Sequence, residues 1–305
     1  MRRFMMRRAG ESIISLVGVT LLVFALSRAT GDPVRLMLGT EGTPDQIAAM
    51  REQLGLNRSL PAQYWHFVSN LVQGDFGDSI KYRRPSLEMI ADRFPSSVVL
   101  ALAAMTIAAT VGITVGVLSA RRPGGLMDGG GRFIALMGQS VPTFWVGLLL
   151  VLLFSLTWQF FPPSGNKGLT SVVLPAVTLG WYSTAALLRV TRSSMRDALD
   201  SQYIVTARSK GLSERVVLGR HALKNSIVAI LSMGALQFVL LLNGAMVTEK
   251  IFNWPGVGSL MVEAAFARDY ALIQAVVVVA AILVIVVNLL TDIAYAVIDP
   301  RIRYR

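Results

Sequence analysis

The chain contains no cysteine and only two histidines among its 305 residues. The absence of cysteine excludes a disulfide framework, a thiolate zinc site and a cysteine nucleophile. His66 and His221 lie far apart in the sequence, so we expect no metal site. No Gly-Lys-Ser or Gly-Lys-Thr occurs, which excludes a P-loop that would bind nucleotide phosphates. Any ATP hydrolysis that drives this protein must therefore take place on another chain.

Charged residues are also scarce, at 15% of the chain, whereas soluble proteins contain about 25%. Hydrophobic residues make up 53% of the sequence, and the mean hydropathy is +0.57. These apolar residues are gathered into runs rather than spread along the chain. This distribution is typical of a membrane protein and not of a globular cytosolic one.

Six apolar runs approach the length of about 20 residues that a helix needs to cross about 30 Å of hydrocarbon. They predict an all-α integral membrane protein with six transmembrane helices. The first run is not followed by a small-x-small cleavage site, so we interpret it as a retained span and not as a signal peptide. The six runs are Ser12–Ser27, Ser97–Ala120, Phe133–Trp158, Val172–Leu188, Ile227–Thr248 and Leu272–Ile298.

Lys and Arg favour one side of the predicted topology. Among the short loops they are concentrated in the segments on the same side as the N-terminus, and cytoplasmic loops carry such an excess. We therefore expect both termini to be cytoplasmic. The net charge of +11 follows from this loop bias, so we expect no nucleic-acid partner. The basic segments are 1–9, 121–132, 189–224 and 299–305.

The spans divide the chain into four parts. The parts are a tail with the first helix (1–29), an extracytoplasmic loop (30–95), a transmembrane core (96–298) and a cytoplasmic tail (299–305). The extracytoplasmic loop has helical patterns around Thr43–Leu54 and Pro61–Val72, and Thr43 or Asp45 is a candidate cap for the first helix.

Ionisable residues are missing from the apolar runs before Asp292. This absence weighs against an ion-coupled transporter, which places such groups inside the membrane, and against an intramembrane enzyme. The polar candidates for a translocation path are Gln139, Ser140, Gln237 and Asn243. Hydrogen bonding between helices is an equally good interpretation of each. The pair Gly112 and Gly116 is interpreted as helix packing.

The cytoplasmic segment 189–224 is predicted to form two short helices separated at Gly211. Glycine can end a helix in the left-handed conformation, and Ser213 can cap the next helix. The segment is either a docking element for an ATP-hydrolysing protein or a basic loop held on anionic lipids. These physical arguments leave the two alternatives open.

A sequence motif in this segment favours the first alternative. Tyr203-Ile-Val-Thr206-Ala207-Arg208-Ser209-Lys210-Gly211-Leu212 resembles the cytoplasmic coupling signature of binding-protein-dependent ABC importer permeases. The resemblance is to their dipeptide, oligopeptide, glutathione and nickel branch, and it covers nearly the whole chain. It departs from the general signature at Val205, where glutamate is usual. It also lacks the Leu-Pro that often follows Asn225-Ser226. Further landmarks occur in the expected order: Gly31-Asp32-Pro33, Leu54-Gly55-Leu56, Gly74-Asp75-Phe76-Gly77-Asp78-Ser79, Arg93-Phe94-Pro95, Ser140-Val-Pro142, Pro163-Ser-Gly165, Leu174-Pro175, Thr191-Arg192-Ser193-Ser194, Glu249-Lys-Ile-Phe252-Asn-Trp-Pro255-Gly256, Arg268-Asp269-Tyr270 and Asp299-Pro300-Arg301.

The resemblance implies a type I ABC importer permease in the bacterial plasma (inner) membrane. It implies a second homologous permease, two ATPase subunits that bind ATP and Mg, and an extracytoplasmic solute-binding protein. The cargo would be a dipeptide or oligopeptide, glutathione among them, carried by alternating access. Nickel import and ion-coupled secondary transport are the alternatives. The chain itself would hold no cofactor and catalyse no reaction.

The resemblance also assigns two sets of contact residues. Tyr203, Thr206, Ala207, Arg208, Lys210, Gly211 and Leu212 would couple the chain to the ATPases. Glu249, Trp254, Pro255, Gly256 and Asp269 would face the binding protein. For Glu249 and Asp269, a capping role within the loop is the simpler alternative. Trp254-Pro255-Gly256 reads as a tight turn with an aromatic anchor at the membrane interface.

Overall fold

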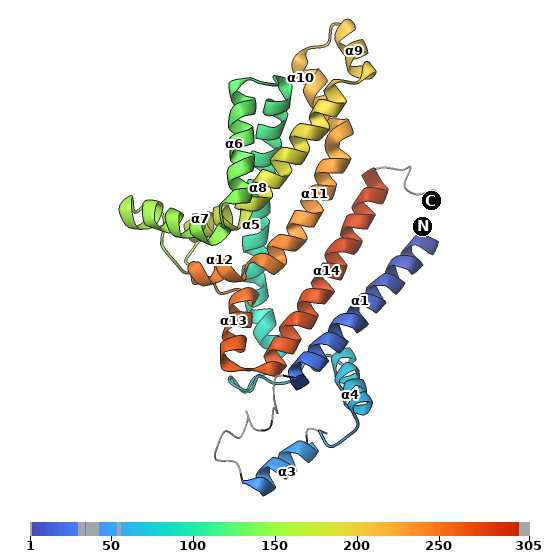
Figure 1. The fold of residues 1–305 in the computed structure, drawn as a ribbon, viewed down its shortest axis with the longest axis vertical. Helices are drawn as coiled ribbons and strands as arrows, with labels where there is room; N and C mark the ends of the chain where they lie inside the picture. The colour runs from blue at the N-terminus through green and yellow to red at the C-terminus, as the bar shows by residue number, and fades with distance from the viewer. Residues whose placement is uncertain (1, 30–33, 35–42, 54–55, 299–305) are drawn as a thin grey trace. The chain divides into compact units, whose positions relative to one another are not determined.

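The computed structural model describes residues 2–29, 34, 43–53 and 56–298, without the side chains of some helical residues. Within these residues the chain is built from helices, as Figure 1 shows. The predicted tail 299–305 and the motif Gly31-Asp32-Pro33 lie outside the described residues. The chain divides into two compact units.

Five helices of the described part are long and apolar enough to cross a membrane, and a bent pair of helices brings the number to six. The structure therefore confirms the predicted all-α membrane class. The five helices are α1 (Arg2–Ala29), α5 (Ser86–Arg121), α8 (Leu169–Leu199), α11 (Leu223–Gly244) and α14 (Tyr270–Ile298).

The expected third span, Phe133–Trp158, is this bent pair. The prediction that it forms one uninterrupted helix is wrong. The chain forms α6 (Leu126–Ser140) and α7 (Thr143–Leu150), and a π-helical turn continues α7 to Thr157. The two parts meet at 106°. Pro142 has no N–H to donate and forces the residue before it out of the helical region, so Val141 is extended with φ −90° and ψ 123°.

Other spans extend beyond their apolar runs. α5 begins at Ser86, inside the segment expected to be the extracytoplasmic loop, and α8 continues past Leu188 to Leu199. Hydropathy marks the part of a helix that matches the hydrocarbon and not the end of the helix itself. The first eleven residues of segment 189–224 are therefore the continuation of a membrane helix.

Unit 1 comprises residues Met1–Pro95 and Leu260–Val286. Its helices α3 (Pro44–Gln53) and α4 (Leu60–Val72) confirm the two helical patterns predicted within segment 30–95. Thr43 caps α3 reciprocally, because its Oγ1 accepts from the Gln46 N–H at 3.4 Å while its own N–H donates to Gln46 Oε1 at 3.0 Å.

The helix α4 packs against α1 within the same unit. The hydroxyls of Thr20 and Tyr64 are hydrogen-bonded at 3.0 Å, and the ring of Phe24 meets the ring of Tyr64 edge-on at 5.6 Å between centroids. These contacts attach α4 to α1, the first membrane helix.

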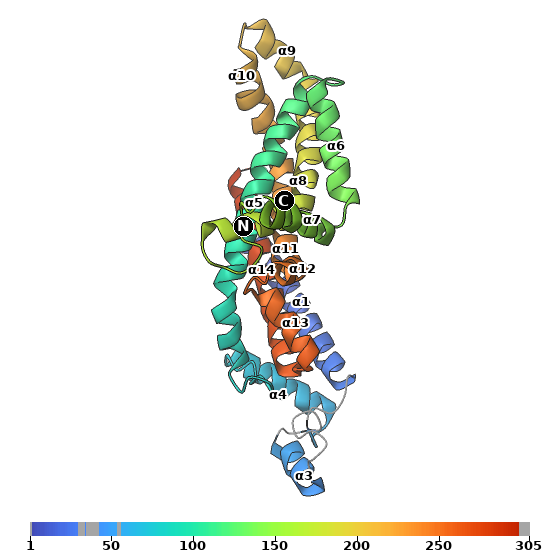
Figure 2. The same ribbon diagram turned by 90° about the vertical axis from the view of Figure 1, so that its left-hand side faces the viewer.

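Unit 2 comprises residues Ser96–Ser259 and Val287–Arg305. In it α8 is the central helix, and α6, α7 and α11 contact it (Figure 1). The short helices α9 (Gln202–Ser209) and α10 (Glu214–Val216) lie together at one end of the unit, as both views show (Figure 2). The helix α12 (Met246–Ile251) follows α11.

Small residues let α5 approach α8 closely. A Cβ atom at Gly112 would lie 2.9 Å from the Thr184 carbonyl oxygen, and one at Gly116 would lie 2.7 Å from Thr191 Cβ. From the other side, a Cβ at Gly180 of α8 would lie 2.8 Å from the Ala104 carbonyl oxygen. Close backbone approach is the main source of helix association in lipid, so this contact stabilises unit 2. The packing interpretation of Gly112 and Gly116 is confirmed.

We expect Gly116→Ala to lower the thermal stability of the purified protein, because the added methyl group collides with α8. Overpacking of this kind typically costs about 1–3 kcal/mol. Gly130→Ala is the matched control, since its Cβ would meet no atom within 4 Å. Thermal unfolding in detergent measures both. Equal melting temperatures for the two variants would contradict the packing role of Gly116.

Candidate functional site

The predicted coupling helix exists and ends where the sequence places its glycine. α9 runs from Gln202 to Ser209, and Gly211 has φ +76°, in the left-handed region. The Gly211 N–H donates to the Arg208 carbonyl at 2.9 Å, and the Leu212 N–H donates to the Ala207 carbonyl at 3.4 Å. This pair of bonds is the Schellman motif that closes a helix C-terminus.

The next helix begins as expected but is capped differently. Ser213 occupies the cap position of α10 with extended backbone angles, φ −65° and ψ 149°, and its side chain makes no capping hydrogen bond. Its carbonyl oxygen accepts from the N–H groups of Val216 and Val217 at 2.9 and 3.0 Å. Six residues of π-helix, Val217–Ala222, then join α10 to α11.

One face of α9 is anchored in a core of its own. Ile204 and Ala207 are buried together with Met195 of α8, Ala120 of α5 and Val217 of the π-helical segment. Ala207 is 5% exposed, so it positions α9 and does not present a side chain to a partner. The coupling role of the helix itself stays a prediction.

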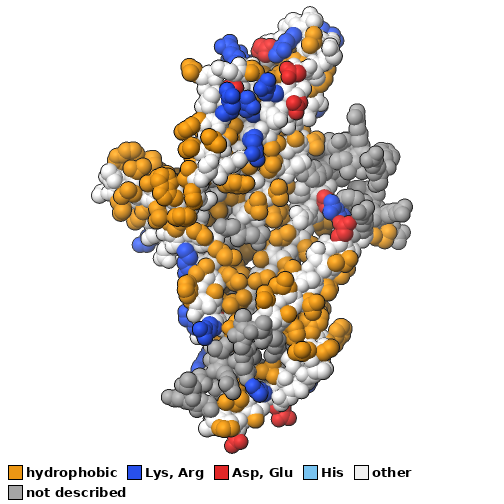
Figure 3. All heavy atoms as spheres, in the orientation of Figure 1, with side chains coloured by type: hydrophobic (Ala, Val, Ile, Leu, Met, Phe, Trp, Pro, Cys, Tyr) orange, Lys and Arg blue, Asp and Glu red, His pale blue; other side chains and the backbone are white. Residues whose placement is uncertain are grey.

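The opposite face of α9 is open. Tyr203 and Leu212 are 41% and 39% exposed, and Thr206 and Lys210 are exposed as well. Arg208 is exposed, and its Nε donates to Glu214 Oε1 at 2.9 Å, which ties α9 to the start of α10. Figure 3 shows Lys and Arg side chains gathered at the end of unit 2 that carries these helices. The surface combines apolar and basic side chains.

The second candidate site is centred on Glu249 in α12. This carboxylate is 0% exposed. Its Oε1 accepts from Ser97 Oγ at 2.8 Å, and its Oε2 accepts from the Ser259 N–H at 2.7 Å. A Cβ at Gly256 would overlap the carboxylate, so only glycine fits there. Glu249 therefore holds the loop that follows it against α5 at Ser97.

Trp254 lies in the core of unit 2, packed with Leu100, Leu179 and Leu241, and is 1% exposed. Its indole N–H donates to the Ser96 carbonyl at 3.0 Å. The expectation that it is an aromatic anchor at the membrane interface is wrong, because the ring supplies apolar surface to the packing of the helices. Pro255 is half-buried beside it.

Asp269 plays a similar part within unit 1. It is 0% exposed, its Oδ2 accepts from Ser79 Oγ at 2.5 Å, and its Oδ1 accepts from the Leu272 N–H at 3.2 Å. It thus caps the start of α14 and fixes the segment around Ser79. For both Asp269 and Glu249 the structure shows the capping alternative. Contact of these loops with a binding protein stays a prediction, and the two carboxylates do not supply an exposed charge for it.

The four path candidates lie in different surroundings. Gln139 and Ser140 are exposed at the end of α6, and the Arg189 side chain donates to Gln139 Oε1 at 3.0 Å. Gln237 is 3% exposed, and its Oε1 accepts from Ser183 Oγ at 2.9 Å, which links α11 to α8. The side chain of Asn243 lies outside the described residues. For Gln237 the structure shows the helix-bonding alternative.

A buried ion pair was missed by the sequence analysis. Asp128 of α6 is 1% exposed and binds Arg192 of α8, Arg132 of its own helix and the Gly124 N–H. It therefore joins the loop before α6, α6 and α8. The sequence held one signal of this ion pair: the landmark Thr191-Arg192-Ser193-Ser194 contains an arginine for which the sequence analysis named no acidic partner.

Comparison with known families identifies the chain. Residues 112–304 match the family described as "Binding-protein-dependent transport system inner membrane component", and residues 1–101 match its N-terminal companion. The chain belongs to this family. It is thus a multi-pass permease component of a bacterial inner membrane, as the resemblance implied.

Similar proteins agree along the full length. The chain is 39% identical to the oligopeptide transport system permease protein AppB of Bacillus subtilis and 39% identical to the glutathione transport system permease protein GsiC of Salmonella choleraesuis. It is 37% identical to the dipeptide transport system permease protein DppB of Escherichia coli. Each alignment covers 100% of both chains.

Solved structures share the fold at low identity. The methionine ABC transporter MetNI in an inward-facing conformation aligns with a TM-score of 0.59 at 13% identity, over 70% of this chain and 97% of the other. An amino acid ABC transporter with histidines aligns with a TM-score of 0.54 at 14% identity, over 68% and 92%. The permease fold expected from the resemblance is confirmed.

We expect Glu249→Ala to lower the melting temperature of the permease strongly. The substitution leaves Ser97 Oγ and the Ser259 N–H without their acceptor, and each buried group left unpaired costs about 1–3 kcal/mol. Glu52→Ala, at an exposed position of α3, is the control and should change little. Thermal unfolding in detergent measures both variants. A Glu249→Ala protein as stable as the control would show that the carboxylate does not hold the loop.

Proposed function

We propose that this chain is a membrane-spanning subunit of an ATP-driven importer for dipeptides or oligopeptides, glutathione among them. The observation that supports the cargo is full-length identity of 37–39% to permeases named for oligopeptide, glutathione and dipeptide transport. The family is binding-protein-dependent, so a solute-binding protein delivers the cargo. The permease works with a second homologous permease and two ATPase subunits.

ATP and Mg bind to the ATPase subunits in this proposal, and the permease contributes motion and no catalysis. The exposed face of α9 docks on an ATPase: Tyr203 and Leu212 supply apolar contact, and Lys210 supplies positive charge. The buried face, with Ile204 and Ala207, passes displacement of α9 to the ends of α5 and α8. Both termini and α9 lie in the cytoplasm, as the distribution of basic residues favours.

The test of this function is reconstitution of the complete complex in liposomes with its binding protein outside. We expect labelled dipeptide or glutathione to accumulate only when ATP is supplied on the α9 side. An imposed proton gradient without ATP should give no uptake, because the six apolar runs contain no ionisable residue before Asp292. Uptake driven by the gradient alone would overturn the proposal, and uptake of Ni²⁺ with no peptide uptake would assign the other cargo.

A further prediction concerns Gly211. A β-branched side chain in the left-handed region costs roughly 1–3 kcal/mol, although no atom lies within 4 Å of a Cβ at this position. Gly211→Val should therefore misplace α9 without a collision. Transport and substrate-stimulated ATP hydrolysis should fall together, by at least about fivefold for a shift of roughly 1 kcal/mol.

Two variants control this experiment. Gly219→Val changes a neighbouring exposed glycine that has no contact within 4 Å and no positive φ, so it should retain activity. Gly211→Asn should retain much of the wild-type transport and ATPase activity, since asparagine tolerates the left-handed region. ATPase rates are compared at equal amounts of assembled complex. Normal stimulation in Gly211→Val would place the coupling element elsewhere.

A further inference from the structure

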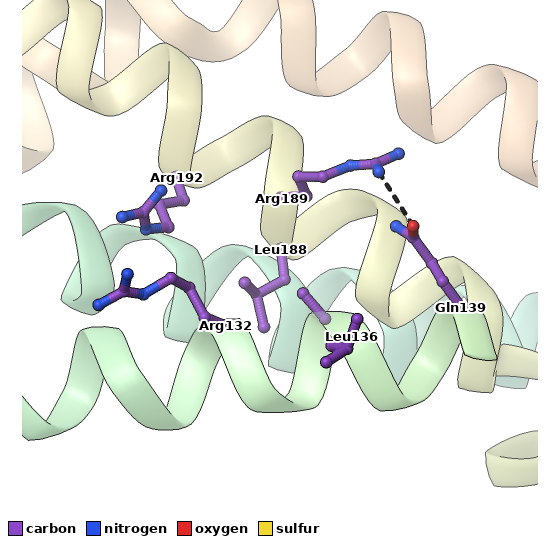
Figure 4. A pocket seen from close by; sticks show the side chains of 7 residues that line it. Arg132, Leu136, Gln139, Leu188, Arg189 and Arg192 are labelled. Carbon is purple, nitrogen blue, oxygen red and sulfur yellow. Dashed lines mark hydrogen bonds between the residues drawn. The ribbon is translucent and has the colours of Figure 1, made fainter. Parts of the chain in front are cut away.

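A groove lined by three arginines opens between α6 and α8. Its volume is about 300 Å³, at the lower end of the roughly 300–1,000 Å³ of small-molecule sites. Arg132 comes from α6, and Arg189 and Arg192 come from α8 (Figure 4). The remaining lining side chains that matter here are Leu136, Leu188 and Gln139. None of these residues belongs to the coupling helix.

The positive charge of the groove is only partly neutralised. Asp128 is the carboxylate that its arginines bind: Arg192 donates to Oδ1, and Arg132 lies 3.2 Å from Oδ2. Arg189 donates to Gln139, a neutral amide, at 3.0 Å. Two guanidinium groups thus face one carboxylate, the third has a neutral partner, and Arg132 remains 59% exposed and able to bind an anion.

The groove lies where the apolar part of α8 ends. From Leu169 to Leu188 the helix has no charged residue. About 20 residues at about 1.5 Å each span about 30 Å, which is the thickness of the hydrocarbon. Arg189 is the first charge after this stretch, so it stands at the depth of the lipid phosphates on the side of α9.

The walls of the groove are apolar where they continue toward the hydrocarbon. Leu136 is 60% exposed, and Phe133, one turn before it on α6, is 62% exposed. Arginines beside exposed apolar side chains suit a molecule with an anionic head and an acyl chain. A soluble anion would use the arginines but leave Leu136 and Phe133 without a partner.

We propose that this groove binds the phosphate of an anionic phospholipid and lays an acyl chain along α6. Arg132 binds the phosphate oxygens, because guanidinium groups bind phosphate through two parallel hydrogen bonds. Arg189 points away from Arg132 in Figure 4 and joins it by turning from Gln139 toward the groove. Arg192 stays bound to Asp128 and orients the groove. Basic pockets between membrane helices commonly hold such headgroups. The site does not rest on the transport function, and it has no part in coupling to the ATPases.

The test uses the assembled complex, delipidated in a neutral detergent and titrated with cardiolipin while bound lipid is counted by native mass spectrometry. Arg189→Gln should weaken cardiolipin binding about fivefold, the effect of one arginine at an anionic membrane surface. Arg122→Gln is the matched control: it removes an exposed arginine of the nearby loop and should change binding by less than about twofold. Arg189→Lys keeps the charge without the two parallel bonds and should fall between wild type and Arg189→Gln. Equal affinities for Arg189→Gln and Arg122→Gln would overturn the proposal.

A second measurement needs no variant. A photoreactive phosphatidylglycerol incorporated with the wild-type complex should label α6 near Leu136, and unlabelled cardiolipin should suppress the labelling. Inorganic phosphate at millimolar concentration should not. Suppression by phosphate alone would assign the groove to a soluble anion. If no label is incorporated and an acidic side chain of the second permease occupies the groove, the proposal is wrong and the groove belongs to the interface between the two permeases.

Discussion

Helices in hydrocarbon gain nothing from hiding apolar surface, so unit 2 depends on how closely α8 can approach its neighbours. Three glycines supply that approach: Gly112 and Gly116 on α5 and Gly180 on α8. Gly138 of α6 meets Ala185 of α8 in the same way. Once these backbones are in contact, a few polar bonds fix the register. Ser183 with Gln237 joins α8 to α11, and Asp128 with Arg192 joins α6 to α8.

Buried carboxylates organise the ends of the helices in this protein. Glu249 and Asp269 are both fully buried, and each accepts hydrogen bonds from a serine hydroxyl and from a backbone N–H. Acceptors of this kind satisfy donors that helix starts leave unpaired. Burial of such a carboxylate among apolar side chains destabilises the fold unless all of its hydrogen bonds are formed. That requirement restricts the loops to one geometry.

The sequence predicted the class of fold, the spans and the end of α9, because each depends on local signals. Hydropathy marks α1, α5, α8, α11 and α14, and Gly211 ends α9 since only local backbone geometry is involved. What it could not predict depends on contacts between distant residues. Trp254 reads as an interfacial anchor until Leu100 and Leu179 are placed around it. Asp128 has no visible role until α8 brings Arg192 beside it. The bend at Pro142 had a local signal, but the apolar run through it concealed the break.

The joints on the two sides of α9 differ in stiffness. Toward α8 only Asp200 and Ser201 intervene, and the Ile204 N–H donates to the Ser201 carbonyl at 3.1 Å, so the turn is closed by hydrogen bonds. Toward α11 the chain passes through Gly211 and then the π-helical residues Val217–Ala222, where the hydrogen-bond ladder is wider. Close-packed cores transmit strain, and Met195 of α8 shares its core with Ile204 of α9. The same core also contains Val217 and Ala222 of the π-helical segment, so α9 packs against both of its neighbours in the chain. Since α8 is the helix that α5, α6 and α11 all contact, the core beneath α9 is continuous with the packing of unit 2.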